Sequence, residues 1–356
     1  MELIEAADVT VIARGAAILG AGGGGDPWLG SLMAQHAIER HGPVRLVPPG
    51  ELQDDAFVLP VALMGAPTVI VEKAPAGDEF RRAFASLEQY RGRAVSHVGC
   101  LEVGGLNSMV PIVSAAMTGL PLVDADGMGR AFPELQMVLL TVDGISCSPM
   151  ALADEKGNAL LLTAVDNEWA ERIARSATVE MGCSATIALY PLNGREARES
   201  LVPHTLTLAR DLGLLVEQTR AAHEDAAEAV AAHARGRVLA RGTVVDVQRR
   251  TVAGFARGSA IIEGFDEWAG SRLELDFQNE HLVARLDGEL VASVPDLICV
   301  LDAENGEPLT TESLRFGYRV AVLALPCHER WRTAAALELV GPRKFGYDHD
   351  YRPVAP

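Results

Sequence analysis

Two aspartates two positions apart are the first residues in this sequence whose spacing suits chemistry. Asp124 and Asp126 end the short apolar run PLVDAD at residues 121–126. If that run is an extended strand, both side chains face the same side, about 7 Å apart. Carboxylates this close either share a proton, which raises the pKa of one of them, or bind a cation or a substrate N–H group. The structural alternative is that one aspartate caps the following turn while the other bonds backbone amides.

A second candidate is a glycine-rich turn near the N-terminus. The segment GAGGGGDP at residues 20–27 contains four consecutive glycines and an aspartate: Gly22, Gly23, Gly24, Gly25 and Asp26. Glycine adopts positive φ readily and lets the backbone approach a ligand or another segment closely. Asp26 can cap a helix that begins at Pro27, which places free amides beside a positive helix end. Such a turn suits an anionic or carbonyl-bearing ligand, and the alternative is a tight turn made only for packing.

The glycine turn does not match the fingerprint of dinucleotide-binding domains. That fingerprint needs a strand before its glycines and an acidic residue about 20 positions later, at the end of the next strand. Here residues 6–19 have the pattern of an alanine-rich helix, and Glu39 lies in a loop-like neighbourhood. We therefore expect no nucleotide cofactor.

The segment from 57 to 166 alternates between short apolar runs and helical patterns, which is typical of a largely parallel sheet with crossover helices. The predicted strands are 57–65, 93–99 and 121–126, the predicted helices are 77–92 and 107–119, and the runs 134–144 and 157–166 extend the sheet or form a hairpin at its edge. After Asp166 an alanine-rich helical stretch at about 205–234 precedes some eight short strand-like segments separated by glycine turns.

We therefore predict an α/β N-terminal domain, residues 1–166, with a largely parallel sheet. Residues 167–356 form a helical connector and a β-rich (α+β) C-terminal domain. In open α/β sheets ligands bind beyond the carboxyl ends of the strands. The polar residues that follow the three predicted strands are Glu72, Lys73, Cys100, Glu102, Asn107, Asp124, Asp126 and Arg130. We expect them to meet the glycine turn at one rim of the sheet.

These candidates suggest two kinds of chemistry. Glu102, Asp124 and Asp126 would orient a water molecule or hold a divalent cation, and carboxylates suit a hard cation better than zinc. A metal-free site agrees equally well with the sequence. Cys100 and Cys183 are candidate nucleophiles, with small packed thiols as the alternative.

Composition and net charge limit the classes of binding partner that we expect. The chain has 356 residues, is 49% hydrophobic, and carries a formal charge of −17. This charge opposes binding to nucleic acid or anionic lipid, so we expect a small-molecule substrate. No apolar run is long enough to span a membrane, and the N-terminus lacks the basic start of an export signal, which predicts a cytoplasmic protein. The five cysteines have no structural-zinc spacing, and a homodimer is the default oligomer.

Three longer segments resemble a known family. ILGAGGGGDP, EVGGLNSMVPIVSAAMTGLPLVDADGMGRAFPELQM and VGPRKFGYDHDY are similar to the S-methyl thiohydantoin desulfurase family, which is associated with hydantoinase and oxoprolinase proteins. FQNEHLVA and VPDLICVLDAENGEPLTTESLRFGYRV extend the resemblance to the C-terminal part. The resemblance implies a hydrolase of a hydantoin-like five-membered ring. In the named activity water replaces a methylthio group, which gives a hydantoin and methanethiol during breakdown of S-methylated ergothioneine.

Within this reading, Asn107, Lys73 and the glycine amides would donate hydrogen bonds to a ring carbonyl. Arg130 or Arg343 would bind a substrate carboxylate through two parallel hydrogen bonds. Two alternatives remain open at this point. One is a non-catalytic ligand-binding or partner subunit of a hydantoinase-like or oxoprolinase-like system, and the other is a ureide hydrolase with Cys100 or Cys183 as nucleophile.

Overall fold

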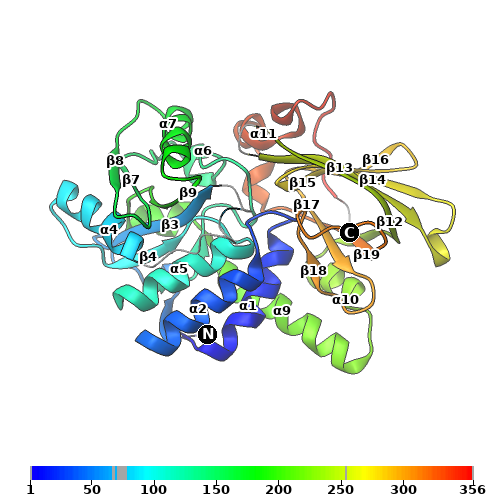
Figure 1. Ribbon diagram of the computed structural model, residues 1–356, viewed down its shortest axis with the longest axis horizontal. Helices are drawn as coiled ribbons and strands as arrows, with labels where there is room; N and C mark the ends of the chain where they lie inside the picture. Colours follow the sequence, from blue (N-terminus) through cyan, green and yellow to red (C-terminus); the bar gives the residue numbers. More distant parts are fainter. Residues whose placement is uncertain (1, 66–68, 70–77, 253–254, 355–356) are drawn as a thin grey trace.

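Two large β-sheets with surrounding helices make up the molecule (Figure 1). The computed structural model describes residues 2–65, 69, 78–252 and 255–354. The first sheet and most of the helices lie on the left of Figure 1, and the second sheet lies on the right. The expected pairing of an α/β N-terminal domain with a β-rich C-terminal domain is confirmed.

The first sheet is mixed and has a parallel centre. Its strands run in the order β1-β2-β5-β4-β3-β9-β7-β8, and β10 also pairs with β3. The three central pairs, β2/β5, β5/β4 and β4/β3, are parallel, whereas the pairs toward both edges are antiparallel. The strands are β1 (Leu3–Ile4), β2 (Val44–Val47), β3 (Phe57–Gly65), β4 (His97–Cys100), β5 (Leu122–Val123), β7 (Met150–Ala153), β8 (Ala159–Leu162), β9 (Ser184–Ala188) and β10 (Leu192–Asn193).

Strand β3, with the sequence FVLPVALMG, is almost wholly buried. All of its residues except Gly65 are buried. A strand covered on both faces has no solvent side, so its sequence is continuously apolar instead of alternating. The helix α5 (Gly105–Thr118) packs against β3 and β4, and α7 (Asn167–Glu180) contacts β3 and β9. The two helices lie on opposite sides of the sheet (Figure 1).

One predicted strand is wrong. In the run 134–144 the chain forms the short helix α6 (Leu139–Val142) instead of a strand, while the run 157–166 does contain β8. The apolar residues of the first run are buried in a short, irregular segment. A short apolar run has the same pattern in a buried strand and in a buried helical turn, so periodicity does not separate the two.

The remaining helices surround the two sheets (Figure 1). They are α1 (Ala6–Leu19), α2 (Pro27–His41), α4 (Asp78–Arg91), α8 (Gly194–Ser200), α9 (Thr205–Ala222), α10 (Ala226–His233) and α11 (Ala334–Val340), with short 3-10 turns at Pro49–Glu51, Asp266–Trp268, Glu329–Arg332 and Pro342–Phe345. Helices α1 and α9 pack closely because Gly15 has no side chain. A Cβ there would lie 1.7 Å from the carbonyl oxygen of Ala209. None of the described helices is both long and apolar enough to cross a membrane.

The predicted start of α2 is confirmed. Asp26 lies directly before Pro27, and its carboxylate accepts hydrogen bonds from the backbone N–H groups of Trp28 at 2.8 Å and Leu29 at 3.2 Å. These are two of the amides that a helix N-terminus otherwise leaves without an acceptor. Local sequence therefore decides where α2 begins.

The second sheet is antiparallel throughout. Its order is β16-β15-β14-β13-β12-β19-β17-β18, and a small separate sheet pairs β6 (Ala125–Asp126) with β11 (Val202–Pro203). Asp287 and Gly288 both have positive φ in the two-residue turn between β15 and β16, as this type of hairpin requires. The strands are β12 (Arg237–Val252), β13 (Phe255–Gly264), β14 (Arg272–Gln278), β15 (Glu280–Leu286), β16 (Glu289–Ser293), β17 (Leu297–Asp302), β18 (Pro308–Leu309) and β19 (Arg319–Leu325).

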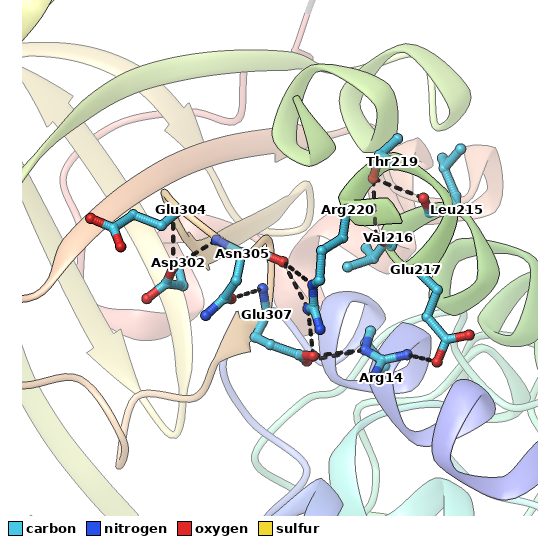
Figure 2. Close-up of polar contacts among 10 residues, drawn as sticks. All are labelled: Arg14, Leu215, Val216, Glu217, Thr219, Arg220, Asp302, Glu304, Asn305 and Glu307. Atoms are coloured by element: carbon cyan, nitrogen blue, oxygen red, sulfur yellow. Dashed lines mark hydrogen bonds and ion pairs between the residues drawn. The ribbon is translucent and has the colours of Figure 1, made fainter. Parts of the chain in front are cut away.

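A network of ion pairs ties α1 and α9 to the loop between β17 and β18 (Figure 2). Arg14 on α1 pairs with Glu217 on α9 at 2.7 Å and with Glu307 in the loop at 3.1 Å. Arg220 on α9 also pairs with Glu307, at 2.6 Å, and donates to the carbonyl oxygen of Asn305. Helix α1 is followed by the glycine turn at 22–25 and β18 is followed by residues 310–312, and both of these segments line a cavity.

Candidate active site

A cavity of about 100 Å³ lies between segments next to the first sheet and segments next to the second. A site of this size has room for several water molecules or for a small ring compound. Two sets of residues line it: 22–25, 62–65, 101–102, 106–107, 128, 132–135, 171, 175 and 187 on the side of the first sheet, and 279–280 and 310–312 on the side of the second. The glycine turn, Glu102 and Asn107 are therefore brought together, as the sequence predicted.

The glycine turn is bonded to both halves of the chain. The carbonyl oxygen of Gly24 accepts a hydrogen bond from the backbone N–H of Asn107 at 3.1 Å, and that of Gly22 accepts one from Thr311 at 2.9 Å. Gly22, Gly24 and Gly25 have φ of 93°, 79° and 82°, a region that favours glycine. A Cβ at Gly24 would also lie 2.4 Å from the backbone of Gly104. These contacts explain why the turn has no side chains.

Glu102 is a buried carboxyl group that other side chains hold in place. The side-chain amide of Asn107 donates to its Oε1, and the same amide accepts from the backbone N–H of Leu63 at 2.8 Å. Burial raises the pKa of Glu102 to about 7, against the opposing hydrogen bonds from Asn107 and from the backbone of Phe132. A carboxyl group with such a pKa can gain and lose a proton near neutral pH.

Glu280 is a further buried carboxyl group in the cavity, and it was not among the residues predicted from the sequence. It begins β15 and is only 2% exposed. Burial raises its pKa well above the ordinary value, the charge of Glu102 adds to this rise, and the charge of Arg130 opposes it. Within the described part of the chain its Oε2 has no hydrogen-bond partner. The available signal was the polar pair Asn279-Glu280 between two apolar strands, in the segment FQNEHLVA.

Asp126 does not line the cavity, but its carboxylate holds the backbone of two loops next to it. Its carboxylate accepts hydrogen bonds from the backbone N–H groups of Val103 at 2.8 Å, Gly129 at 2.9 Å and Met128 at 3.2 Å. Burial raises its pKa to about 7, although these three bonds act in the opposite direction. Asp126 thereby fixes the loop that carries Glu102.

Asp124 holds the start of α9, away from the cavity. It accepts hydrogen bonds from the backbone N–H groups of Leu206 and Thr207, both at 3.1 Å, and from the hydroxyl group of Thr207 at 2.6 Å. The predicted strand 121–126 is interrupted at Asp124, because β5 ends at Val123 and Asp126 belongs to the small separate sheet. Both aspartates therefore bind backbone amides, as the structural alternative predicted.

The three carboxylates considered as metal ligands do not converge. Glu102 faces the cavity, whereas Asp124 and Asp126 are turned to backbone amides on α9 and in the 101–104 and 127–129 loops. Across the described ranges, no three His, Cys, Asp or Glu side chains form a group that could hold a metal ion. The expected ligand set of Glu102, Asp124 and Asp126 is thus not formed.

Neither candidate cysteine lines the cavity. Cys100 is fully buried and donates from Sγ to the carbonyl oxygen of Glu102 at 3.0 Å. Burial raises the pKa of its thiol well above the ordinary value, and the nearby carboxylates add to this rise, so the reactive thiolate is disfavoured. Cys183 is half-buried in the turn between α7 and β9, where its φ is 64°.

The two arginines expected to bind a substrate carboxylate also lie outside the cavity. Arg130 is fully buried and donates to the carbonyl oxygens of Pro295 at 2.6 Å and Asp296 at 2.9 Å. Arg343 is exposed and pairs with the nearby Asp348 and Asp350. Glu72 and Lys73 lie outside the described residues.

Arg175 is the cation that lines the cavity among the described residues, and the sequence analysis did not identify it. It lies on α7, forms an ion pair with Glu171 one turn earlier, and stacks over the ring of Phe255 with 4.6 Å between guanidinium carbon and ring centroid. Phe255 begins β13 in the second sheet. The Arg175 contact is therefore a further link between the first sheet, against which α7 packs, and the second sheet.

Two family models match the chain. One family model, the S-Me-THD-like N-terminal domain, matches residues 7–164, and a second, the S-Me-THD-like C-terminal domain, matches residues 165–354. The chain belongs to the S-Me-THD-like family. The resemblance to the S-methyl thiohydantoin desulfurase family is thereby confirmed over nearly the whole chain. Glu102 falls in the S-Me-THD-like N-terminal domain and Glu280 in the C-terminal one.

A solved structure has the same architecture as this S-Me-THD-like protein. It is the crystal structure of a protein from Chromobacterium violaceum, which aligns with a TM-score of 0.81 and 25% sequence identity. The alignment covers 99% of this chain and 100% of that chain. A search of curated proteins finds no match.

Proposed function

We propose that this S-Me-THD-like protein is a hydrolase of a hydantoin-like five-membered ring. Its substrate is an S-methyl thiohydantoin, and its products are a hydantoin and methanethiol. The observation that carries the proposal is a small cavity between the two family domains with a buried carboxyl group from each, Glu102 and Glu280. Family membership supports the substrate class, and the cavity supports proton-transfer chemistry on a small ring.

The reaction needs both a proton acceptor and a proton donor. The oxygen of water forms a bond to the ring carbon between the two nitrogens, and the bond from this carbon to sulfur breaks. Overall, one proton of the water goes to the ring nitrogen and the other to methanethiol. Two carboxyl groups with raised pKa values can serve these transfers near neutral pH.

The glycine turn supports the same chemistry through its backbone. In the described part of the chain, the N–H groups of Gly24 and Gly25 donate to no protein acceptor. Both residues line the cavity, next to the N-terminus of α5. Backbone N–H groups in a water-poor site can bind a ring carbonyl and stabilise the negative charge that develops on it. No metal ion is needed for this route, and the residues that line the cavity supply each of its groups.

The test is release of methanethiol from an S-methyl thiohydantoin, measured with a thiol-reactive dye. We expect the wild-type protein to release it, and we expect Glu102→Gln and Glu280→Gln each to lower turnover by about 10² or more, the scale of losing a positioned acid or base. Glu289→Gln, an exposed change at the start of β16, is the control and should retain wild-type turnover. Binding of the substrate by the wild-type protein without release would instead identify a ligand-binding protein.

A further inference from the structure

Glu102 and Glu280, two of the five carboxyl groups that line the cavity, differ in the hydrogen bonds that they receive. Glu102 accepts from the side-chain amide of Asn107 and from the backbone of Phe132. Glu280 receives no hydrogen bond from another residue within the described ranges, and its Oε2 is buried without a partner. Donors stabilise the ionised form of a carboxyl group, whereas burial without donors stabilises the neutral form. The surroundings therefore favour a charge on Glu102 and a proton on Glu280.

The charged groups around the pair support this division. The charge of Asp126 acts on Glu102, and the charge of Glu102 acts on Glu280. The other charged groups that line the cavity are the ion pair of Glu171 with Arg175 and the carboxyl groups of Glu134 and Glu312. Glu280 faces Glu102 and Arg130, but the guanidinium of Arg130 is bonded to the carbonyl oxygens of Pro295 and Asp296. No ion pair within 4 Å joins Arg130 to Glu280 among the described residues. A negative charge on Glu102 thus favours the protonated form of Glu280, since two like charges in one cavity disfavour each other.

We propose that Glu102 acts as the base and Glu280 as the acid when water adds to the ring. This assignment rests on the proposed function. As the oxygen of water bonds to the ring carbon, Glu102 takes a proton from that water and Glu280 gives its proton to the ring nitrogen. As the carbon–sulfur bond then breaks, Glu102 returns its proton to the sulfur and Glu280 takes the proton of the new hydroxyl group. Each carboxyl group ends in its starting state, so the cycle balances.

The assignment predicts how turnover depends on pH. The active form has Glu102 ionised and Glu280 protonated, so turnover rises as Glu102 loses its proton near pH 7, where burial has placed its pKa. Turnover falls at higher pH as Glu280 loses its proton, because burial raises the pKa of Glu280 well above the ordinary value. The pair titrates as one coupled system, so the two midpoints belong to both groups.

The direct test is infrared spectroscopy of the substrate-free protein at pH 8, where protonated carboxyl groups absorb apart from ionised ones. We expect the difference spectrum between wild type and Glu280→Gln to contain a protonated carboxyl band, and the spectrum between wild type and Glu102→Gln to contain none. The control, Glu289→Gln, should also give none. A protonated band assigned to Glu102, or the absence of one for Glu280, overturns the proposal.

A second variant keeps the proposal testable if Glu280→Gln does not fold. Asn107→Ala removes a donor to Glu102, so we expect the midpoint at which Glu102 loses its proton to move to higher pH, while the Glu280 band at pH 8 remains. If the midpoint for Glu102 does not change, the hydrogen bond from Asn107 does not stabilise the ionised form of Glu102, which contradicts the proposal. These measurements use no substrate, so their failure is distinct from a failure of the wild-type protein to release methanethiol.

Discussion

The carboxyl group of Glu280 lies directly against the backbone of Gly23. A Cβ built at Gly23 would be 2.0 Å from Oε1 of Glu280, far closer than two atoms can approach. Gly23 belongs to the N-terminal domain and Glu280 to the C-terminal domain. The absence of a side chain at Gly23 therefore makes room for a carboxyl group from the other domain.

We expect Gly23→Ala to displace the carboxyl group of Glu280 and to lower kcat/KM by up to about 100-fold. This is the scale of loss when a catalytic group is misplaced by about 1 Å. The φ of Gly23 is not in the left-handed region, so alanine is strained there by contact with Glu280 and not by its own backbone. Gly50→Ala is the matched control, since a Cβ there meets nothing within 4 Å. Wild-type kcat/KM in Gly23→Ala would contradict a role for Glu280 in catalysis.

We expect Asp124→Asn to affect stability more than chemistry. The variant weakens charge-assisted hydrogen bonds to the start of α9, so the free energy of unfolding should fall by about 1.5–3 kcal/mol in a urea titration. Turnover of the folded variant should stay within about threefold of wild type, because Asp124 does not line the cavity. Asp211→Asn, an exposed change on the same helix, is the control. A large loss of turnover without a loss of stability would instead indicate a catalytic role for Asp124.

We expect Glu307→Gln to lower the melting temperature at pH 7 but not at low pH. Partial burial works to raise the pKa of Glu307, yet the hydrogen bonds from Arg220 and Arg14 outweigh it and hold the pKa below its ordinary value of 4.5. A lowered pKa in the folded state stabilises the protein above pH 4.5, and this contribution disappears as the pH falls through the folded-state value.

The size of the Glu307 effect should be modest, at most about 1 kcal/mol, because the ion pairs are partly exposed and are screened by salt. Melting curves of wild type and Glu307→Gln, recorded at pH 7 and pH 3, measure it. Glu304→Gln is a control on the same loop, since Glu304 is exposed and has no ion pair among the described residues. An equal difference at both pH values would contradict the assigned charge pairing.

We expect Cys100→Ala and Cys183→Ser to keep turnover within about twofold of wild type. The thiol of Cys100 is buried and its pKa is raised, so it is a poor nucleophile, and Cys183 does not line the cavity. Methanethiol release by both variants measures this directly. A loss of about 10² or more in either one, with the fold intact by circular dichroism, would favour the cysteine-nucleophile alternative.

Local features of the fold were readable from the sequence alone. The alanine-rich pattern at 6–19 predicts α1, the Asp26-Pro27 pair predicts the start of α2, and the apolar run at 57–65 predicts the strand β3. These features depend on interactions within a few residues, such as the capping of two amides by Asp26. The glycine turn and Glu102 were likewise identified, because both lie next to the ends of recognisable elements.

The composition of the site was decided only by the tertiary structure. Asp124 and Glu102 are both acidic residues after predicted strands, yet Asp124 is used to start α9 and Glu102 faces the cavity. Glu280 reaches that cavity only because β15 of the second sheet is placed against the glycine turn, where Ala21 accepts a hydrogen bond from His281. Sequence spacing defines which face of one element a side chain occupies. Which elements then meet depends on packing between distant parts of the chain, and no local pattern encodes it.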